Sequence, residues 1–177
     1  MTKTIIRKGV FESNSSSTHA ICIATHSTLA FPDFVKFRIG EFGWECTTYH
    51  LFEDKASYLY TAILELKEDE NKGDIPVEEW EEIEWITNVL ANNGIAVEFE
   101  EPRWEKWECS EEYYLDYGYI DHASELKDWL KDILNDEDKL LNYLFTEDSY
   151  VETGNDNDDY GVDIKVTYPH EEYYKWN

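Results

Sequence analysis

The sequence predicts an α+β fold, in which a mixed or antiparallel β-sheet carries two pairs of helices. Short apolar stretches with strand-like spacing lie near both ends of the chain and once in the middle. Between them lie two stretches with the three- to four-residue apolar spacing of amphipathic helices. No internal repeat and no flexible linker interrupts this order, so we expect one domain over residues 1–177.

Four strands are expected in the first third of the chain, at residues 4–11, 20–25, 34–39 and 44–50. Residues 20–25 (AICIAT) are apolar at successive positions, which is typical of a strand buried on both faces. Residues 34–39 (FVKFRI) place Lys36 and Arg38 on one face, because successive side chains of a strand alternate. Strands 4–11 and 34–39 are candidates for neighbours in the sheet.

The middle of the chain changes to a helical period. Residues 54–67 are expected to form a helix with one apolar stripe, made of Ala56, Leu59, Ile63 and Leu66. A second helix is expected over 76–92, because Pro76 suits a helix start and Gly94 suits a stop. Its stripe consists of Trp80, Ile83, Thr87 and Leu90. Residues 95–100 (IAVEFE) alternate and predict a strand.

The last third predicts a helix pair followed by a hairpin. A helix is expected over 122–134, capped by Asp121, and another over 137–145. Residues 149–153 and 162–168 are the predicted hairpin strands. The acidic loop between them fails the calcium-loop template, since Thr167 stands where that loop has Glu. Residues 102–119 fit no period and receive no assignment.

Composition favours a folded protein of the reducing cytoplasm. The 177 residues are 42% hydrophobic and 16% aromatic, unlike a disordered chain. No apolar run is long enough to cross a membrane, and no signal peptide is evident. Three widely spaced cysteines are expected to be reduced thiols. Nucleotide-binding glycine motifs and histidine pairs with zinc spacing are missing from the sequence, so we expect no cofactor and no metal.

Charge is the most unusual property of the chain, with 40 acids against 15 bases and a net charge of −25. Residues 1–40 carry more bases than acids, so the negative charge lies in residues 41–177. Such a field repels nucleic acid and attracts basic partners. We therefore expect no direct nucleic-acid or membrane binding.

The acidic runs include like-charged neighbours on one helix, which stability does not require. We interpret them as a surface that imitates the phosphates of nucleic acid, with aromatic anchors among the acids. The expected partner-binding residues are Glu78, Glu79, Glu81, Glu82, Glu84, Glu98, Glu100, Glu101, Trp104, Trp107, Glu111 and Glu112. The alternatives are an acidic surface that only maintains solubility, and aromatics that belong to the core.

The stretch Asn14–His19 (NSSSTH) is the other candidate site. Small polar residues in series form turns without further purpose, and a structural turn is the interpretation we favour. A ligand loop is the alternative, with Arg7, Ser15, Ser16, Ser17, His19 and Lys36 around an anion or nucleotide. Serine hydrolase chemistry is disfavoured, because no nucleophile-elbow or Ser-x-x-Lys motif occurs.

The same stretch carries a resemblance. Phe11 with Asn14–His19 resembles the F-x-x-N-S-S-S-x-H segment near the start of small uncharacterised proteins encoded by bacteriophages and mobile elements. Residues 143–158 are similar to a second segment of such proteins. The resemblance implies a phage or prophage setting, but it brings no activity and no catalytic residue.

Together these observations predict a non-enzymatic, cytoplasmic protein of phage-infected cells. Its expected partner is a basic, nucleic-acid-handling protein of the host or of its defence system, whose binding groove it would block. A small-molecule or nucleotide binder that uses the N-terminal loop is the second hypothesis. An accessory structural phage protein is the third.

Overall fold

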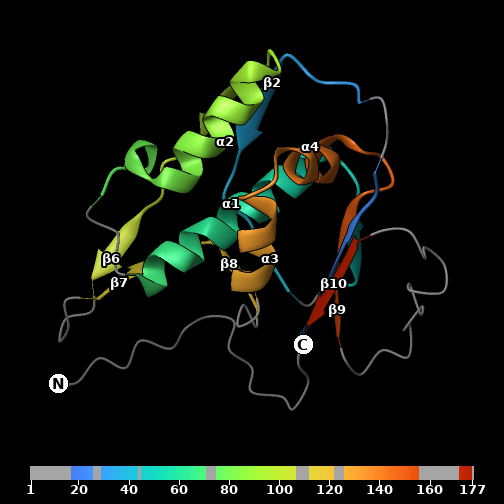
Figure 1. The fold of residues 1–177 in the computed structure, drawn as a ribbon. Helices are drawn as coiled ribbons and strands as arrows, with labels where there is room; N and C mark the ends of the chain where they lie inside the picture. The colour runs from blue at the N-terminus through green and yellow to red at the C-terminus, as the bar shows by residue number, and fades with distance from the viewer. Residues whose placement is uncertain are drawn as a thin grey trace, which may run out of the picture.

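The computed structural model describes residues 17–25, 29–43, 45–70, 75–106, 112–121, 126–155 and 172–176. These residues form an α+β fold, with an antiparallel sheet, four α-helices and three short strand pairs. Figure 1 shows α1 running through the middle of the molecule, with the sheet to one side. The predicted fold class is therefore confirmed.

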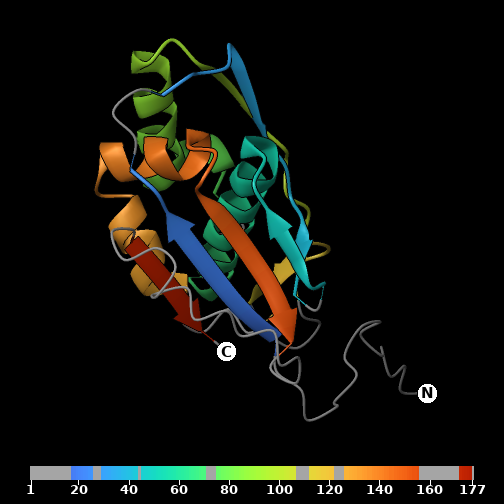
Figure 2. The same cartoon turned by 90° about the vertical axis from the view of Figure 1, so that its right-hand side faces the viewer.

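The four-stranded sheet has the order β10-β1-β9-β4, and each neighbouring pair is antiparallel. Figure 2 faces this sheet, with α1 behind it. The strands are β10 (Glu172–Trp176), β1 (Ser17–Ile23), β9 (Tyr150–Asn155) and β4 (Thr47–Tyr49). The central strand β1 pairs on both sides, and Ile21 lies opposite both Tyr174 and Val151.

The N-terminal strands differ from the sequence prediction in two ways. The predicted turn at Asn14–His19 is wrong for its last three residues, because β1 already begins at Ser17. Ser17 and His19 are buried there, so their side chains serve the interior rather than a turn. The predicted strand 4–11 lies outside the described residues, as does 162–168, the expected partner of 149–153.

Helix α1 (Phe52–Asp69) is the centre of the core. The predicted stripe is confirmed at Ala56, Leu59 and Ile63, which are all buried. Tyr58, Tyr60, Ala62 and Leu64 on other sides of the helix are also buried. A helix that is apolar nearly all round is surrounded by other elements, and α1 contacts the sheet, α3, α4 and β2.

The predicted helix 76–92 is interrupted. Val77–Glu79 form the 3₁₀ turn η1, and α2 begins only at Glu81 and ends at Asn92. Between them Trp80 has an extended backbone, and its buried indole Nε1 donates to the carbonyl of Ile75 at 3.1 Å. Burial of this large side chain across the turn explains why the helical period does not continue through it.

Parallel pairs extend the fold beyond the sheet. Strand β2 (Phe34–Phe37) pairs with β5 (Ala96–Phe99), and β3 (Glu41–Phe42) pairs with β8 (Tyr119–Ile120). The strands expected at 34–39 and 95–100 are thereby confirmed in shorter form. The strand expected at 44–50 is shortened to β4.

The unassigned segment 102–119 contains three short strands. Strands β6 (Trp104–Lys106) and β7 (Tyr113–Leu115) form an antiparallel hairpin, and β8 follows after Gly118. Gly118 has φ +83° and lies against Ile39, so only glycine suits this position. Strands of two or three residues are too short to show a period.

The second helix pair packs on α1. Helix α3 (Leu126–Ile133) buries Leu126, Trp129, Leu130 and Ile133, as its apolar spacing predicts. Helix α4 (Glu137–Phe145) has its predicted bounds, and the Asp136 side chain accepts from the Lys139 N–H at 3.1 Å. Residues 122–125, the expected start of α3, lie outside the described residues.

Candidate functional site

The exposed acids of η1 and α2 form the first part of the candidate site. Glu78 and Glu79 lie on η1, and Glu81 and Glu84 follow on the first turns of α2; all four are exposed. The extended backbone at Trp80 separates the two pairs. Since residues 77–92 include no Lys or Arg, these carboxylates have no basic neighbour on their own elements.

Glu82 differs from these four acids and does not belong to the partner-binding set in the way the sequence suggests. Its Oε1 accepts from the buried ammonium of Lys67 on α1 at 2.8 Å, and Lys67 also donates to Glu70 at 3.1 Å. Burial by itself would lower the pKa of Lys67, but the hydrogen bonds and charges of Glu82 and Glu70 together raise it. Glu82 therefore ties α2 to α1.

The acids at the end of β5 form the second part of the candidate site. Glu98 pairs with the Lys36 ammonium on the neighbouring strand β2. Glu100 is half-buried, with Oε1 accepting from the Tyr117 hydroxyl at 2.7 Å and Oε2 accepting from the Ile39 N–H at 3.2 Å. Glu101 beside it is exposed. Of these three acids, only Glu101 presents a carboxylate without such an internal role.

The fold brings the two acidic runs together around Tyr60. Burial raises the pKa of this tyrosine, and the negative charges of Glu101, Glu78 and Glu100 raise it further. The Tyr60 hydroxyl itself donates to the Glu100 carbonyl at 2.7 Å. Acids that are more than 20 residues apart in the sequence thus act on one buried hydroxyl, and α2 contacts both η1 and β5.

Aromatic side chains accompany the acids, but they divide between core and surface. Trp104 is half-buried and its ring centroid lies 6.2 Å from that of the buried Trp80. Trp104 therefore belongs partly to the core. On the hairpin that follows, the Arg103 guanidinium lies 4.6 Å from the centroid of the Tyr117 ring, and the Lys106 ammonium lies 4.3 Å from that of Tyr113.

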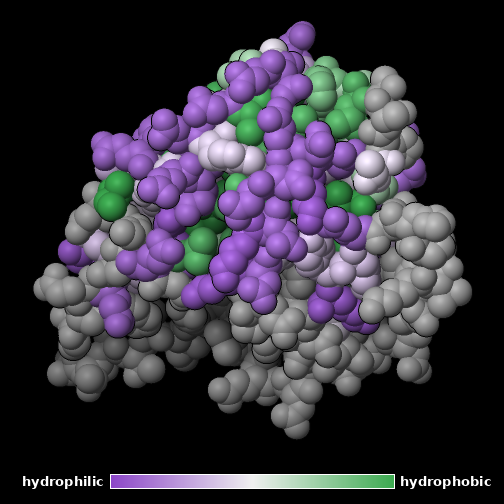
Figure 3. Space-filling model, viewed as in Figure 1, coloured by the Kyte–Doolittle hydropathy of each residue, from purple (hydrophilic) through white to green (hydrophobic). Residues whose placement is uncertain are grey.

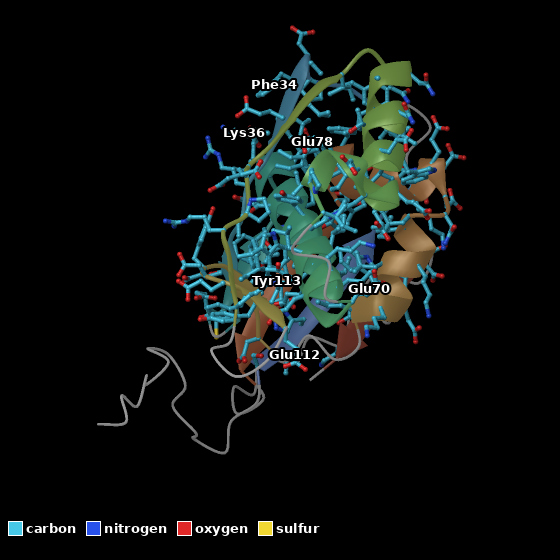
Figure 4. All side chains as sticks on the ribbon, turned by 90° about the vertical axis from the view of Figure 1, so that its left-hand side faces the viewer. Phe34, Lys36, Glu70, Glu78, Glu112 and Tyr113 are labelled. Atoms are coloured by element: carbon cyan, nitrogen blue, oxygen red, sulfur yellow. The ribbon has the colours of Figure 1, made fainter. Side chains whose placement is uncertain are left out.

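Figure 4 shows one side of the molecule with six residues labelled. They run from Phe34 and Lys36 near the β2 end, through Glu78, to Tyr113, Glu70 and Glu112 at the hairpin end. Figure 3 shows that the adjoining face is largely hydrophilic over α1, α2 and α3, with hydrophobic side chains in small separate areas. Trp107 and Glu111, the remaining expected residues, lie outside the described part of the chain.

Many bases of the described residues already have an acidic partner. Besides Lys36 and Lys67, Lys139 pairs with Glu172 at 2.8 Å and Lys131 lies 3.5 Å from Asp128. The described surface therefore offers many more uncompensated carboxylates than cations, as the net charge of −25 requires.

The expected ligand loop is not assembled among the residues that the structure describes. Ser17 and His19 belong to β1 of the four-stranded sheet, whereas Lys36 belongs to β2 and pairs with Glu98. Both Ser17 and His19 are at most 1% exposed. Arg7, Ser15 and Ser16 lie outside the described residues.

Ser17 and His19 instead belong to a buried hydrogen-bond chain. The Ser17 hydroxyl donates to the Asp121 carbonyl at 3.3 Å, and its oxygen lies 3.4 Å from His19 Nε2. His19 Nδ1 lies 3.0 Å from the Tyr58 hydroxyl. Because the single Ser17 proton is directed to a carbonyl, the consistent assignment has Nε2 as donor and Nδ1 accepting from Tyr58. A histidine in that state does not act as a base toward Ser17.

Sequence reasoning named the aromatics of residues 103–119 as possible anchors or core residues, but it did not include the hairpin tyrosines among the site residues. Tyr113, Tyr114 and Tyr117 stand beside acids and next to the only two bases of the β6–β7 hairpin region that the structure describes, Arg103 and Lys106. The two bases within this aromatic, acidic segment were the available signal for contacts between bases and rings. The sequence does not show that Lys106 lies opposite Tyr113, because that follows from the pairing register of β6 and β7.

Comparison with known proteins gives no matching family model, no matching curated protein and no matching solved structure. The resemblance to phage and mobile-element proteins therefore stays a prediction. In the described part of the chain, no helix combines the length and apolar character needed to cross a bilayer. The same residues contain no group of three or more His, Cys, Asp or Glu arranged to hold a metal ion.

Proposed function

We propose that this protein is a non-enzymatic inhibitor that binds a basic, nucleic-acid-handling protein and occupies its nucleic-acid groove. The acidic surface consists of Glu78, Glu79, Glu81 and Glu84 together with Glu101. The partner is a host protein or a component of its defence against phage, in keeping with the resemblance of the N-terminal stretch.

The observation that carries the proposal is that α2 contacts both η1 and β5, and that the exposed acids of this region (Glu78, Glu79, Glu81, Glu84 and Glu101) form no ion pair with a base of the described residues. Carboxylates accept the same Arg and Lys hydrogen bonds that phosphates accept. A duplex presents about one phosphate per 1.7 Å of its axis, so a basic groove is built for a closely spaced row of anions. Neighbouring acids on a folded surface offer such a row without bases.

The mechanism is competitive occupation of the groove. Attraction between the acidic surface and the groove speeds encounter, and this steering weakens as salt screens the charges. Aromatic side chains of the neighbouring hairpin supply contacts that depend on shape rather than on charge alone. No covalent chemistry is involved, which agrees with the buried and hydrogen-bonded state of Ser17 and His19.

A matched pair of charge-reversed variants tests the proposal. The first variant replaces Glu78, Glu79, Glu81 and Glu84 with Lys and leaves Glu82 in place, because Glu82 holds Lys67. The control reverses four exposed acids on other elements: Asp33→Lys, Glu41→Lys, Asp128→Lys and Glu147→Lys. Both variants have the same net charge, so a difference between them reports the position of the acids.

Each immobilised protein is exposed to host lysate at low salt, and every retained protein is then assayed singly for displacement of a fluorescent DNA duplex. We expect the wild type and the control to retain a nucleic-acid-binding protein that the first variant does not retain. We also expect the wild type to displace the DNA duplex from that protein. Equal retention by both variants, or retained proteins that keep their duplex, would contradict the proposal.

A further inference from the structure

An apolar surface is formed by Phe31, Leu51, Phe52 and Phe145, which come from three separate parts of the chain. The centroid of the Phe145 ring lies 5.3 Å from that of Phe31 and 6.0 Å from that of Phe52. Leu51 directly precedes Phe52. Figure 2 shows the end of α4 and the start of α1 beside each other above the strands. The four side chains therefore form one continuous surface.

Two members of the apolar surface are open to solvent. The exposed fraction is 65% for Leu51 and 38% for Phe31, whereas Phe52 and Phe145 are half-buried. Among the large hydrophobic residues that the structure describes, Leu51 is the most exposed. Single exposed apolar side chains are common, but neighbouring ones that form a patch mark sites of interaction.

Leu51 also stands at a helix position that favours a polar side chain. It is the N-cap of α1, and its side chain makes no capping hydrogen bond to the N–H groups of the first turn. Asn, Asp, Ser and Thr stabilise helices at this position, whereas Leu is strongly disfavoured. Residues that contradict local preferences in this way are expected at functional sites.

Carboxylates lie on the α4 side of the apolar surface. Lys55 Nζ donates to the carbonyls of Thr146 and Ser149 at 2.8 and 2.9 Å. These two bonds hold the turn between Thr146 and Ser149 against the first turn of α1. The turn contains Glu147 and Asp148, and both are exposed.

The start of α1 carries a second pair of acids. Glu53 is exposed and Asp54 is half-buried; burial and the negative charge of Glu53 raise the pKa of Asp54. Neither Glu53 nor Glu147 forms an ion pair with a base of the described residues. The apolar surface therefore has an acidic border without neutralising bases.

We propose that the apolar surface is the docking site for a basic amphipathic segment of a partner protein. Its apolar side chains cover Leu51 and Phe31, and its Lys or Arg side chains pair with Glu53 and Glu147. Charge favours this occupant over a second copy, which would bring another net charge of −25 and the same acidic border. The inference goes beyond the proposed function and does not depend on it, because the surface lies on other elements than η1 and α2.

Two labelled peptides test the inference without knowledge of the partner. One is an amphipathic peptide of Leu and Lys at helical spacing, and the other has Ala in place of every Leu and the same charge. Fluorescence polarisation at physiological ionic strength measures the affinity of the whole chain for each peptide. We expect the wild type to bind the Leu peptide at least about tenfold more tightly than the Ala peptide, because charge attracts both equally and only Leu buries a large apolar area.

A matched pair of variants locates the preference for the Leu peptide. The test variant is Phe31→Ser with Leu51→Asn. The control is Ile75→Ser with Tyr119→Asn, which also removes two exposed apolar side chains, 37% and 43% exposed, from other places. We expect the preference to fall to about twofold or less in the test variant and to persist in the control. A preference that persists in the test variant, or that falls equally in both, would overturn the inference.

Leu51→Asn alone gives a result that a purely structural role of Leu51 would not produce. Asn is a preferred N-cap, so this variant should have a higher melting temperature than the wild type while it binds the Leu peptide more weakly. A lower melting temperature would assign Leu51 to the stability of the fold and would overturn the inference.

Other occupants of the apolar surface would give different results. A wild-type dimer in sedimentation that Leu51→Asn abolishes would place a second copy there. Tighter binding of the Leu peptide after Ile5→Asn with Ile6→Asn would place the N-terminal segment of the same chain there. Either result would overturn the inference. Failure of the η1–α2 charge reversal to affect partner binding would leave these peptide results intact, so the two proposals fail separately.

Discussion

Lys55 is a buried ammonium whose hydrogen-bond partners among the described residues include no carboxylate. It is 1% exposed, and its Nζ donates to the carbonyls of Thr146 and Ser149 at 2.8 and 2.9 Å. These bonds fasten the end of α4 and the start of β9 to the first turn of α1. Burial lowers the pKa of Lys55 to about 8.

The lowered pKa of Lys55 predicts a pH dependence of stability. Between pH 8 and about 10.5 the unfolded chain binds this proton and the folded chain does not, so stability rises with pH in that window. The rise attributable to Lys55 is at most about 3 kcal/mol. Lys55→Met should remove it. Urea unfolding at pH 7.5 and 10 measures how the unfolding free energy of the wild type and of the Lys55→Met variant changes with pH. Equal changes in the two proteins would contradict the prediction.

His19 depends on Tyr58 for the hydrogen bond at Nδ1. Tyr58→Phe removes the buried hydroxyl that lies 3.0 Å from this ring nitrogen, which should cost about 1–3 kcal/mol of unfolding free energy. Tyr119→Phe is the control, because the Tyr119 side chain is exposed. Urea midpoints compare the two variants. A Tyr58→Phe protein as stable as the control would mean that the chain from Ser17 to Tyr58 is unimportant for the fold.

At the scale of elements, Lys67 joins α1 to α2 through Glu82. Glu82→Lys would place a second cation against the buried Lys67 and leave that ammonium without one of its two carboxylate partners, so we expect a loss of about 3 kcal/mol or more. Glu81→Lys reverses an exposed neighbour and should change stability by less than about 0.5 kcal/mol. Thermal or urea unfolding compares the stability of the two variants. Equal losses would show that the effect comes from the change in net charge and not from the Lys67–Glu82 pair.

The sequence predicted the long elements and missed the contacts between them. Helix α4 was predicted with its observed bounds, because its apolar spacing and Asp136–Glu137 start are local signals. Glu82 was grouped with the neighbouring exposed acids, because its partner Lys67 lies 15 residues away in the sequence and no local pattern indicates the pair. The short strands β6 and β7 left no period to read, so the rings of Tyr113 and Tyr117 were not assigned to a surface.

The break at Trp80 shows how a local prediction fails for a tertiary reason. Residues 76–92 have helical spacing throughout, and a continuous helix satisfies every local rule. The Trp80 indole is nevertheless 3% exposed and bonded to Ile75, so core packing determines the backbone there. The outcome matters for the candidate site, since Glu78 and Glu79 lie on η1 and not on α2.

For the whole molecule, the excess of negative charge acts on stability as well as on binding. With a net charge of −25, repulsion among carboxylates opposes the compact state. Salt reduces the Debye length from about 10 Å at 0.1 M to about 3 Å at 1 M, which screens exposed acids more than partly buried pairs such as Lys67–Glu82. Added salt should therefore stabilise this protein, although it weakens the exposed ion pairs.

We expect the melting temperature of the wild type to rise between 0.05 and 0.5 M NaCl, by roughly 2–4 °C for each kcal/mol of repulsion removed. The melting temperature of the four-Lys variant of η1 and α2 should rise less with salt than that of the scattered control of equal net charge. The reason is that the four acids replaced in this variant lie on adjoining turns, where their mutual repulsion is concentrated. Differential scanning calorimetry of the three proteins measures this. Equal rises in the two variants would show that these acids do not form a concentrated patch, and a melting temperature that falls with salt would show that ion pairs outweigh repulsion.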